Sequence, residues 1–229
     1  MNLDLAYSVD SQLYYSGEFE PTTVAMLREL VKPGGTVFDV GANIGYLSLI
    51  LRTCVGEAGR VVSFEPMPRV FERLRANIEL NRFENIEPVH AGLGDSAGSA
   101  MLALDRAIRL DGRAGEPQPA ELVTLDDYVA RHAISRLDLV KIDTDGAEPA
   151  VLRGAGRALE RFKPIVVIEL GAREKGSAAE SIDLLRHHGY VFFDESGAQA
   201  INDPLGAIRS LASGTTTNLV ARWREGADG

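Results

Sequence analysis

The stretch TVFDVGANIGYLSLI, residues 36–50, is the segment that indicates the fold most directly. A short apolar run contains Asp39 near its end, Gly41 and Gly45 follow, and apolar residues then return at helical spacing. Glycine adopts positive φ readily, and its missing Cβ lets a ligand approach the backbone. A helix that starts after such a turn also presents free N–H groups at its N-terminus. The pattern therefore predicts a strand, a ligand-binding turn and a helix.

The rest of the chain alternates strand-like and helix-like segments. Uninterrupted Val, Ile and Leu runs are typical of strands buried on both faces, and their alternation with helices indicates a parallel sheet. The later strand-like runs are residues 60–65, 86–92, 137–143, 164–170, 190–194 and 217–223, and the helix-like ones are 21–31, 45–55, 69–81, 147–162 and 178–189. We therefore predict a doubly wound α/β sheet whose last strand enters antiparallel.

Composition and charge argue against several classes of protein. The formal net charge of −9 gives no overall positive field for nucleic acid. No apolar run approaches the roughly 20 residues of a membrane-spanning helix, and the N-terminus lacks the basic start and apolar core of a secretory signal. Cys54 is the only cysteine, which fits a reducing cytoplasm. We expect a cytoplasmic protein that binds neither nucleic acid nor membrane, and the sequence leaves a homo-oligomer open.

The spacing of the glycines distinguishes between nucleotide ligands. Dinucleotide-binding folds use G-x-G-x-x-G, but here Asn43 stands in place of the second glycine and would crowd a pyrophosphate. Glu65 ends the second strand, where a carboxylate can accept both ribose hydroxyls, and Asp39 could hold an ammonium. An amino acid joined to adenosine without phosphates, S-adenosylmethionine, matches this pattern. The alternatives are an NAD(P)-dependent oxidoreductase and a non-catalytic nucleotide-binding protein.

Several blocks of sequence, taken in order, resemble one known family. They are DVGANIGYLSL, FEPMPRVFERLRANIELN, VTLDDY, LDLVKIDTDGAEPAVLRGA and PIVVIEL. Over about residues 17–170 the chain is similar to the FkbM-type family of S-adenosylmethionine-dependent methyltransferases. The resemblance implies a class I methyltransferase fold, with a mostly parallel seven-stranded sheet and an antiparallel last strand. It also implies methyl transfer, most often to a hydroxyl oxygen of a sugar, polyketide or other natural product, and in some relatives to nitrogen.

The domain organisation follows from the length and the resemblance. We expect one methyltransferase domain over residues 1–229, with a helical N-terminal extension at 1–34 and a Rossmann-like core at 35–222. Residues 109–121, rich in Gly, Pro and charged residues, are expected to form a loop or hairpin connection within it.

The candidate cofactor-binding residues combine the turn, the strand ends and the family pattern. Glu20 precedes the first helix, where the family has a similar acid, and Ala91 follows the third strand with His90, Gly92 and Asp95, near the place of the adenine. The full set is Glu20, Asp39, Gly41, Ala42, Asn43, Gly45, Tyr46, Glu65, Pro66, Ala91 and Asp143.

Two acids at strand ends are the candidate catalytic residues. Asp143 ends a buried apolar run, where an unpartnered carboxylate would be costly, and Glu169 ends the next one. We expect Asp143 to take the acceptor's hydroxyl proton, helped by Glu169. With Asp145 the two acids could instead bind Mg²⁺, although a divalent metal is not favoured. The family usually has Glu where this chain has Asp145, so roles are not copied onto that residue.

The methyl acceptor is the part of the function that the sequence leaves unidentified. We expect a small molecule, held by the segments that vary most in this fold, here residues 1–20, 100–122 and 172–180.

Overall fold

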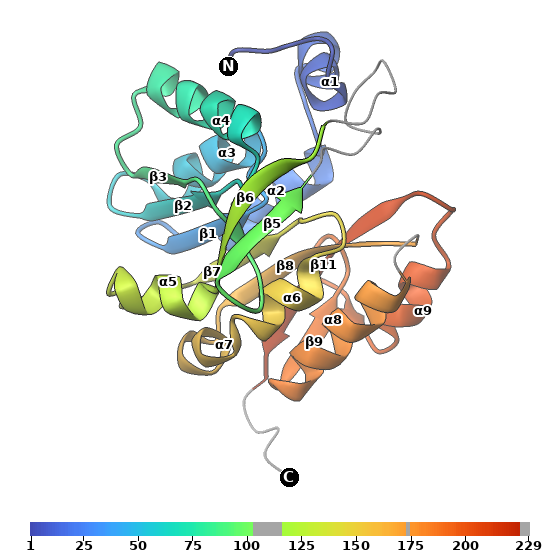
Figure 1. Cartoon of the computed structure of the whole chain (residues 1–229). Coiled ribbons are helices and arrows are strands. Elements are labelled where there is room, and N and C mark those ends of the chain that lie inside the picture. Colours follow the sequence, from blue (N-terminus) through green and yellow to red (C-terminus); the bar gives the residue numbers. More distant parts are fainter. Residues whose placement is uncertain (103–115, 173–174, 225–229) are drawn as a thin grey trace.

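A twisted sheet between two layers of helices forms the centre of the molecule (Figure 1). The computed structural model describes residues 1–102, 116–172 and 175–224. Within them the sheet has eight strands, in the order β10 (Ala200–Ile201), β9 (Tyr190–Phe193), β11 (Thr216–Trp223), β8 (Ile165–Gly171), β7 (Leu139–Ile142), β1 (Thr36–Val40), β2 (Arg60–Phe64) and β3 (Ile86–Val89).

The directions of the strands confirm the predicted fold class. Strands β3, β2, β1, β7 and β8 are parallel neighbours. Strand β11 is antiparallel to β8 on one side and to β9 on the other. The sheet is therefore doubly wound and mostly parallel, with an antiparallel last strand. One two-residue strand, β10, pairs with β9 and adds to the seven strands expected.

Each face of the sheet buries its own hydrophobic core, because successive strand residues point to opposite faces. Val37, Val61 and Leu139 face the first group of helices, and Phe38, Phe64 and Ile142 face the second. The first group is α2 (Pro21–Leu30), α3 (Tyr46–Val55) and α4 (Pro68–Asn81), and the second is α5 (Leu125–Arg131), α6 (Glu148–Arg153), α7 (Gly156–Phe162), α8 (Lys175–His187) and α9 (Pro204–Arg209).

The segment 147–162, expected as one helix, is two helices. Helix α6 ends at Arg153 and α7 begins at Gly156. A Cβ built on Gly154 would lie 2.0 Å from the carbonyl oxygen of Gly94, so the chain bends where it packs against another backbone segment. Tertiary packing overrides the helical periodicity here.

A second, three-stranded sheet was not expected from the sequence. It consists of β4 (Gly92–Leu93), β6 (Gln118–Val123) and β5 (Gly98–Leu102), in that order. The predicted connection at 109–121 therefore overlaps strand β6 from residue 118 onward, and residues 109–115 lie outside the described part of the chain.

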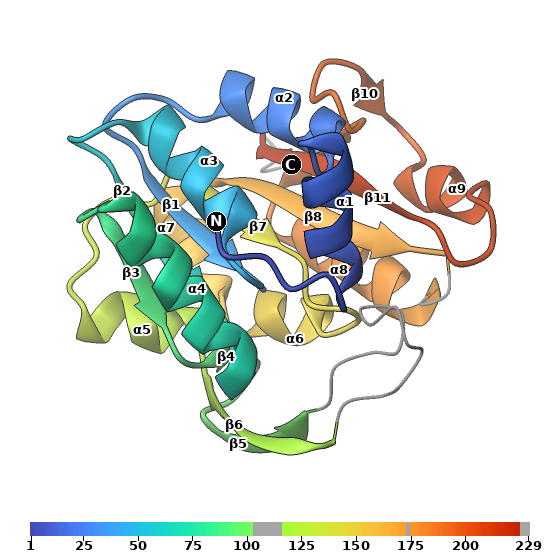
Figure 2. The same ribbon diagram turned by 90° about the horizontal axis from the view of Figure 1, so that it is seen from above.

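A short N-terminal helix, α1 (Ser8–Ser16), lies above the ends of the central strands (Figure 2). Its Leu13 packs with Ile44 and Met67, which follow β1 and β2. Asp10, 1% exposed, forms an ion pair with Arg73 of α4. Asn77 of α4 donates to the carbonyl of Ile44 at 2.9 Å and accepts from the backbone N–H of residue 2 at 2.6 Å. Residues 1–20, here called the N-terminal arm, therefore contact both α4 and the turn that follows β1.

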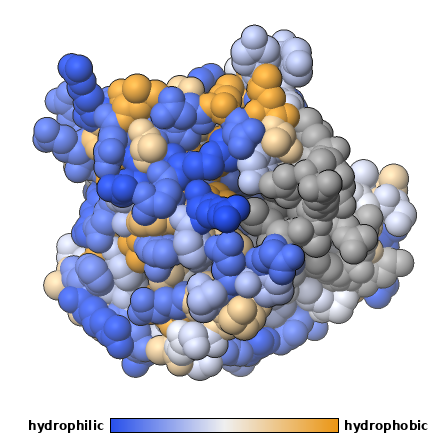
Figure 3. Space-filling model, turned by 45° about the horizontal axis from the view of Figure 1, so that its top comes forward, coloured by the Kyte–Doolittle hydropathy of each residue, from blue (hydrophilic) through white to orange (hydrophobic). Residues whose placement is uncertain are grey.

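Polar side chains dominate the face of the molecule that Figure 3 shows. Figure 3 shows hydrophilic residues over most of one face, with hydrophobic side chains confined to smaller areas. In the described part of the chain, none of the helices has the length and apolar character needed to cross a membrane.

Helix α5 offers a test of the local energetics. Thr124 is its N-cap, and its hydroxyl accepts a hydrogen bond from the backbone N–H of Asp127 at 3.0 Å. We expect Thr124→Ala to lower the free energy of unfolding by about 1 kcal/mol and the melting temperature by roughly 2–4 °C. Thermal unfolding followed by circular dichroism measures the change. Thr22→Ala, at an exposed position of α2, is the control and should change stability little; equal losses in both variants would contradict the capping role.

Candidate active site

Four of the predicted site residues lie at one edge of the central sheet. Asp39, Glu65, Asp143 and Glu169 lie at or just beyond the carboxyl ends of β1, β2, β7 and β8, which are parallel. Carboxyl ends of parallel strands share an edge, and ligands bind there where the strand order reverses. In this sheet the order reverses at β1, between β2 and β7.

The turn after β1 has the close backbone approach that its glycines predict. Gly41 has φ of 80°, and a Cβ built on it would lie 1.8 Å from the carbonyl oxygen of Asp143. Asn43 also has positive φ, 50°, and its Oδ1 accepts the N–H of Ile44 at 2.8 Å. Gly45, with φ of 89°, leads into α3. The turn therefore lies directly against the chain that leaves β7.

The flanking turn residues have more varied surroundings. Ala42 is buried, whereas Tyr46 is half-buried and its ring meets Phe19 edge to face, with centroids 6.2 Å apart. Phe19 belongs to the segment joining α1 to α2, so the N-terminal arm lies beside the turn.

Glu65 holds the two strand-end turns together. Its Oε2 accepts the backbone N–H of Asn43 at 3.0 Å, and its Oε1 accepts that of Met67 at 2.8 Å. The side chain is 6% exposed, and this burial raises the pKa of Glu65 to about 7 in spite of both hydrogen bonds. Each carboxylate oxygen has a second lone pair, so the group can still accept hydroxyl donors. Pro66 follows it and is half-buried.

Asp39 lies beneath the turn rather than on its surface. It is fully buried, and its Oδ2 accepts the hydroxyl of Ser48 at 2.6 Å. The strand register places Asp39 beside Lys141 of β7. Its Oδ1 has no hydrogen-bond partner within the described residues. Burial raises the pKa of Asp39, and the ammonium of Lys141 opposes that rise.

A cluster of three carboxylates lies beyond Lys141. Glu20, Asp143 and Glu169 each bring a carboxylate oxygen within 4.8 Å of the other two, a spacing that could hold a metal ion. Glu20 reaches it from the N-cap of α2 with an unusual φ of 47°. The third acid of the expected metal set, Asp145, is exposed and does not belong to this group.

Lys141 supplies the positive charge in this region. Its Nζ lies 2.7 Å from Asp143 Oδ2, and its side chain is 3% exposed. Burial would lower the pKa of Lys141, but the charges of Asp143 and Asp39 outweigh burial and raise it. The lysine is therefore an ammonium ion inside the protein.

The proton in the cluster resides on Glu169. Burial and the charge of Asp143 raise the pKa of Glu169 to about 9, although Thr216 donates to its Oε1 at 2.7 Å. Burial alone would raise the pKa of Asp143, but Lys141 and the hydrogen bond with Glu169 lower it. At neutral pH Asp143 is thus ionised and Glu169 is protonated. Burial also raises the pKa of Glu20, which is hydrogen-bonded to Thr23.

The residues expected near the adenine are more dispersed. Ala91 is buried between β3 and β4, and Gly92 begins β4. His90 is exposed and stacks on Phe71, with centroids 4.5 Å apart. Asp95 forms a surface ion pair with Arg153.

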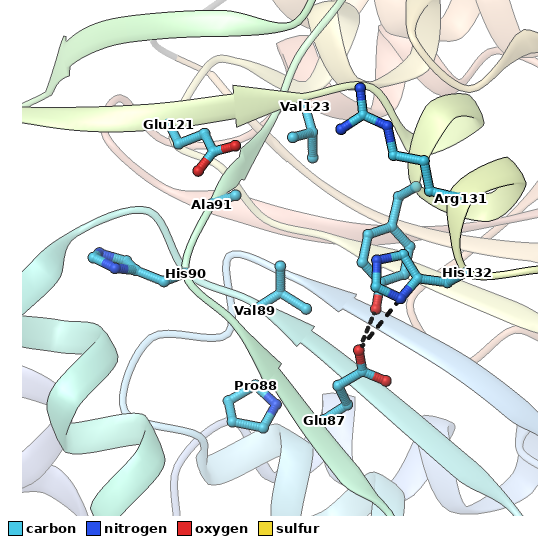
Figure 4. A pocket seen from close by; sticks show the side chains of 10 residues that line it. Glu87, Pro88, Val89, His90, Ala91, Glu121, Val123, Arg131 and His132 are labelled. Atoms are coloured by element: carbon cyan, nitrogen blue, oxygen red, sulfur yellow. Dashed lines mark hydrogen bonds and ion pairs between the residues drawn. The ribbon is translucent and has the colours of Figure 1, made fainter.

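A cavity of about 380 Å³ lies along β3, beside β6 and α5 (Figure 4). Among the predicted cofactor-binding residues only Ala91 lines it, so this cavity does not coincide with the predicted cofactor site. On its wall, Glu87 accepts the hydroxyl of Tyr128 at 2.7 Å, and the imidazole of His132 stacks on that ring.

Sequence reasoning missed Lys141, the residue that connects Asp39 with the carboxylate cluster. A signal for it exists in LDLVKID, because a lysine inside a buried apolar run requires a charged partner. Thr216 and Ser48 were missed as well, and an isolated hydroxyl residue carries no comparable signal.

Comparison with known proteins identifies the family. Residues 39–192 match the model of the methyltransferase FkbM domain. The 31-O-demethyl-FK506 methyltransferase FkbM of Streptomyces tacrolimicus is 30% identical, over 85% of this chain and 82% of that protein. The AMB antimetabolite synthetase AmbE of Pseudomonas aeruginosa is 29% identical over 70% of this chain, which spans only 10% of that protein.

A solved structure supports the fold independently. The crystal structure of a methyltransferase FkbM from Methylobacillus flagellatus KT superposes with a TM-score of 0.58 at 18% sequence identity, covering 92% of this chain and 50% of the other.

Proposed function

The chain belongs to the methyltransferase FkbM domain family and is an S-adenosylmethionine-dependent methyltransferase, and we propose that it methylates a hydroxyl oxygen of a small molecule. The Streptomyces relative is named as a methyltransferase of 31-O-demethyl-FK506, which supports oxygen as the acceptor atom. The net charge of −9 supports a small molecule over nucleic acid. Family membership decides against the NAD(P)-dependent oxidoreductase. N-methylation remains the second outcome of the acceptor test below.

One observation carries the proposal: an acid that can bind a ribose and an ionised carboxylate flank the same glycine turn. Glu65 lies on one side of the turn, and Asp143 touches its other side through the backbone contact at Gly41. The ionised carboxylate of Asp143 beside the turn favours a cationic cofactor and repels the phosphates of a dinucleotide. The N-terminus of α3 adds backbone N–H donors to these carboxylate acceptors.

Different residues of the chain bind the cofactor and accept the proton of the acceptor. When bound, S-adenosylmethionine supplies a methyl group on a positively charged sulfur that leaves as a neutral thioether. Glu65 accepts the ribose hydroxyls, and Gly41 and Asn43 shape the turn beneath the nucleoside. Glu20 and Asp143 face the positively charged part, and Asp143 takes the proton of the acceptor hydroxyl as the oxygen bonds to the methyl carbon. Positioning of the hydroxyl is the largest contribution, because the leaving group is already good.

Within this proposal Glu169 is a proton holder rather than the base. It is protonated at neutral pH and donates to Asp143, which fixes the orientation of the Asp143 carboxylate. The proposal also assigns Ala42, Gly45, Tyr46, Pro66 and Ala91 to the surroundings of the cofactor. A cytoplasmic location and a single methyltransferase domain belong to the same proposal.

Cofactor affinity should depend on pH through Glu65. Because its pKa is about 7, roughly a tenth of the carboxyl is ionised at pH 6 and nine-tenths at pH 8. The ionised form accepts hydroxyl donors more strongly, so affinity is lost as pH falls through 7. We expect S-adenosylhomocysteine to bind roughly ninefold more tightly at pH 8 than at pH 6, measured by titration calorimetry. Glu65→Gln should show a flatter profile; an unchanged wild-type affinity across this range would contradict the assignment.

The acceptor itself is found by labelling. The protein is incubated with methyl-labelled S-adenosylmethionine and pooled cell extract, and mass spectrometry identifies the labelled product. We expect an O-methyl ether of a small molecule, and no label when Asp143→Asn replaces the wild type. A labelled amine, or label only in macromolecules, would refute the proposed acceptor class.

A further inference from the structure

Lys141 lies beside a group of three acids, in which Glu169 is protonated and Asp143 is ionised at neutral pH. Glu20, Asp143 and Glu169 lie within 4.8 Å of one another, and Asp39 lies beside Lys141 in the register of β1 and β7. Protonation of Glu169 removes one negative charge from this half-buried group. The carboxylates that remain ionised still repel one another and favour a cation beside them, and carboxylate oxygens are ligands that hard divalent metals prefer.

Lys141 already occupies the position from which a cation would act. Its ammonium lies 2.7 Å from Asp143, and its charge acts on Asp39, Glu20 and Glu169 as well. It projects from β7, a central strand, and its side chain is 3% exposed, so its ammonium lies inside the protein next to the cluster. A metal entering the cluster would meet this fixed positive charge.

We propose that Lys141 is the resident cation of the carboxylate cluster, a positioning residue that holds Asp143 against the acceptor hydroxyl without a divalent metal. This inference rests on the proposed function for the role of Asp143, but the charge arrangement itself does not. It makes Lys141 the structural reason why the cluster, although spaced for a metal, does not bind one in the wild-type enzyme.

Removing the ammonium should turn the cluster into a metal site. Lys141→Met keeps the length of the side chain and deletes its charge, whereas Lys141→Arg keeps the charge. The probe is Mn²⁺ alone, titrated at pH 7.5 into the wild-type protein and each variant and followed by electron paramagnetic resonance. We expect K141M to bind one Mn²⁺ at least about tenfold more tightly than the wild type or K141R. Mn²⁺ should raise the melting temperature of K141M and leave that of the wild type unchanged.

The second substitution Asp143→Asn locates the ion. In K141M it should abolish the Mn²⁺ site. A purely structural lysine would lower the stability of K141M without creating a site, and that result would overturn the proposal. A wild-type Mn²⁺ site as tight as that of K141M, and lost in D143N, would overturn it as well. Should K141M fail to fold, the comparison of wild type with D143N decides: a wild-type site that D143N removes refutes the proposal, and the absence of such a site supports it.

Binding of S-adenosylhomocysteine, measured on the same samples, separates a failure of the proposed function from a failure of the role proposed for Lys141. Wild-type protein that does not bind it would refute the proposed function, whatever the Mn²⁺ titrations show. Normal binding together with a Mn²⁺ site in the wild type would refute the role of Lys141 alone.

Discussion

Glu65→Ala should weaken the binding of S-adenosylhomocysteine by on the order of 100-fold or more. The carboxylate is assigned to the ribose hydroxyls, and each hydrogen bond to a charged group contributes about 1.5–3 kcal/mol. The same side chain accepts the backbone N–H groups of Asn43 and Met67, so its removal also frees the turn that shapes the site. Titration calorimetry measures the affinity, and circular dichroism confirms that the variant is folded.

A matched control separates the loss of Glu65 from the loss of any glutamate. Glu84 is exposed in the connection between α4 and β3, and Glu84→Gln should bind the ligand as the wild type does. If E65A retained wild-type affinity while folded, Glu65 would not be the ribose ligand, and the choice between nucleotide ligands would lose its main structural support.

Asp143→Asn should have the opposite profile, with binding kept and turnover lost. The substitution preserves shape at the strand end but removes the ionised carboxylate, and loss of a positioned base lowers rates by about 10²–10⁴-fold. We expect methyl transfer to the acceptor found by labelling to fall by about 10³-fold, with the affinity for S-adenosylhomocysteine within about threefold of the wild type.

The melting temperature of D143N provides a second, independent measurement. Without Asp143 the ammonium of Lys141 loses its closest partner, and breaking a buried ion pair on one side costs about 3–5 kcal/mol. D143N should therefore melt at a clearly lower temperature, and the assays belong well below that transition. Asp183→Asn, exposed on α8, is the control and should alter neither rate nor melting. Wild-type turnover in folded D143N would rule out Asp143 as the base.

The sequence predicted the parts of the site that repeat a local pattern. The turn after β1 could be predicted because two glycines separate a short strand from a helix. Both Gly41 and Gly45 have the positive φ that such a turn requires. Glu65, Asp143 and Glu169 were readable because each ends an apolar run, and parallel strands bring such ends to one edge. The family match extends over residues 39–192, which contain all of these positions.

The remaining parts depend on contacts between segments far apart in the chain. Whether Lys141 lies beside Asp39 is decided by the register of β1 and β7, which no local pattern reports. The position of Glu20 depends on the N-terminal arm, whose helix α1 buries only Asp10 and Leu13 and so shows little periodicity. The break at Gly154 reflects packing against the backbone of Gly94. All three features arise from tertiary structure. The positions of Lys141 and Glu20 also determine which charges lie together in the site.

The most direct test of the central claim compares two ligands on the wild-type protein. Titration calorimetry with S-adenosylhomocysteine and, separately, with NAD⁺ asks which nucleotide the crevice at the strand ends accepts. The account predicts one molecule of S-adenosylhomocysteine bound per chain and no heat of binding with NAD⁺. Binding of NAD⁺ with no binding of S-adenosylhomocysteine would contradict it.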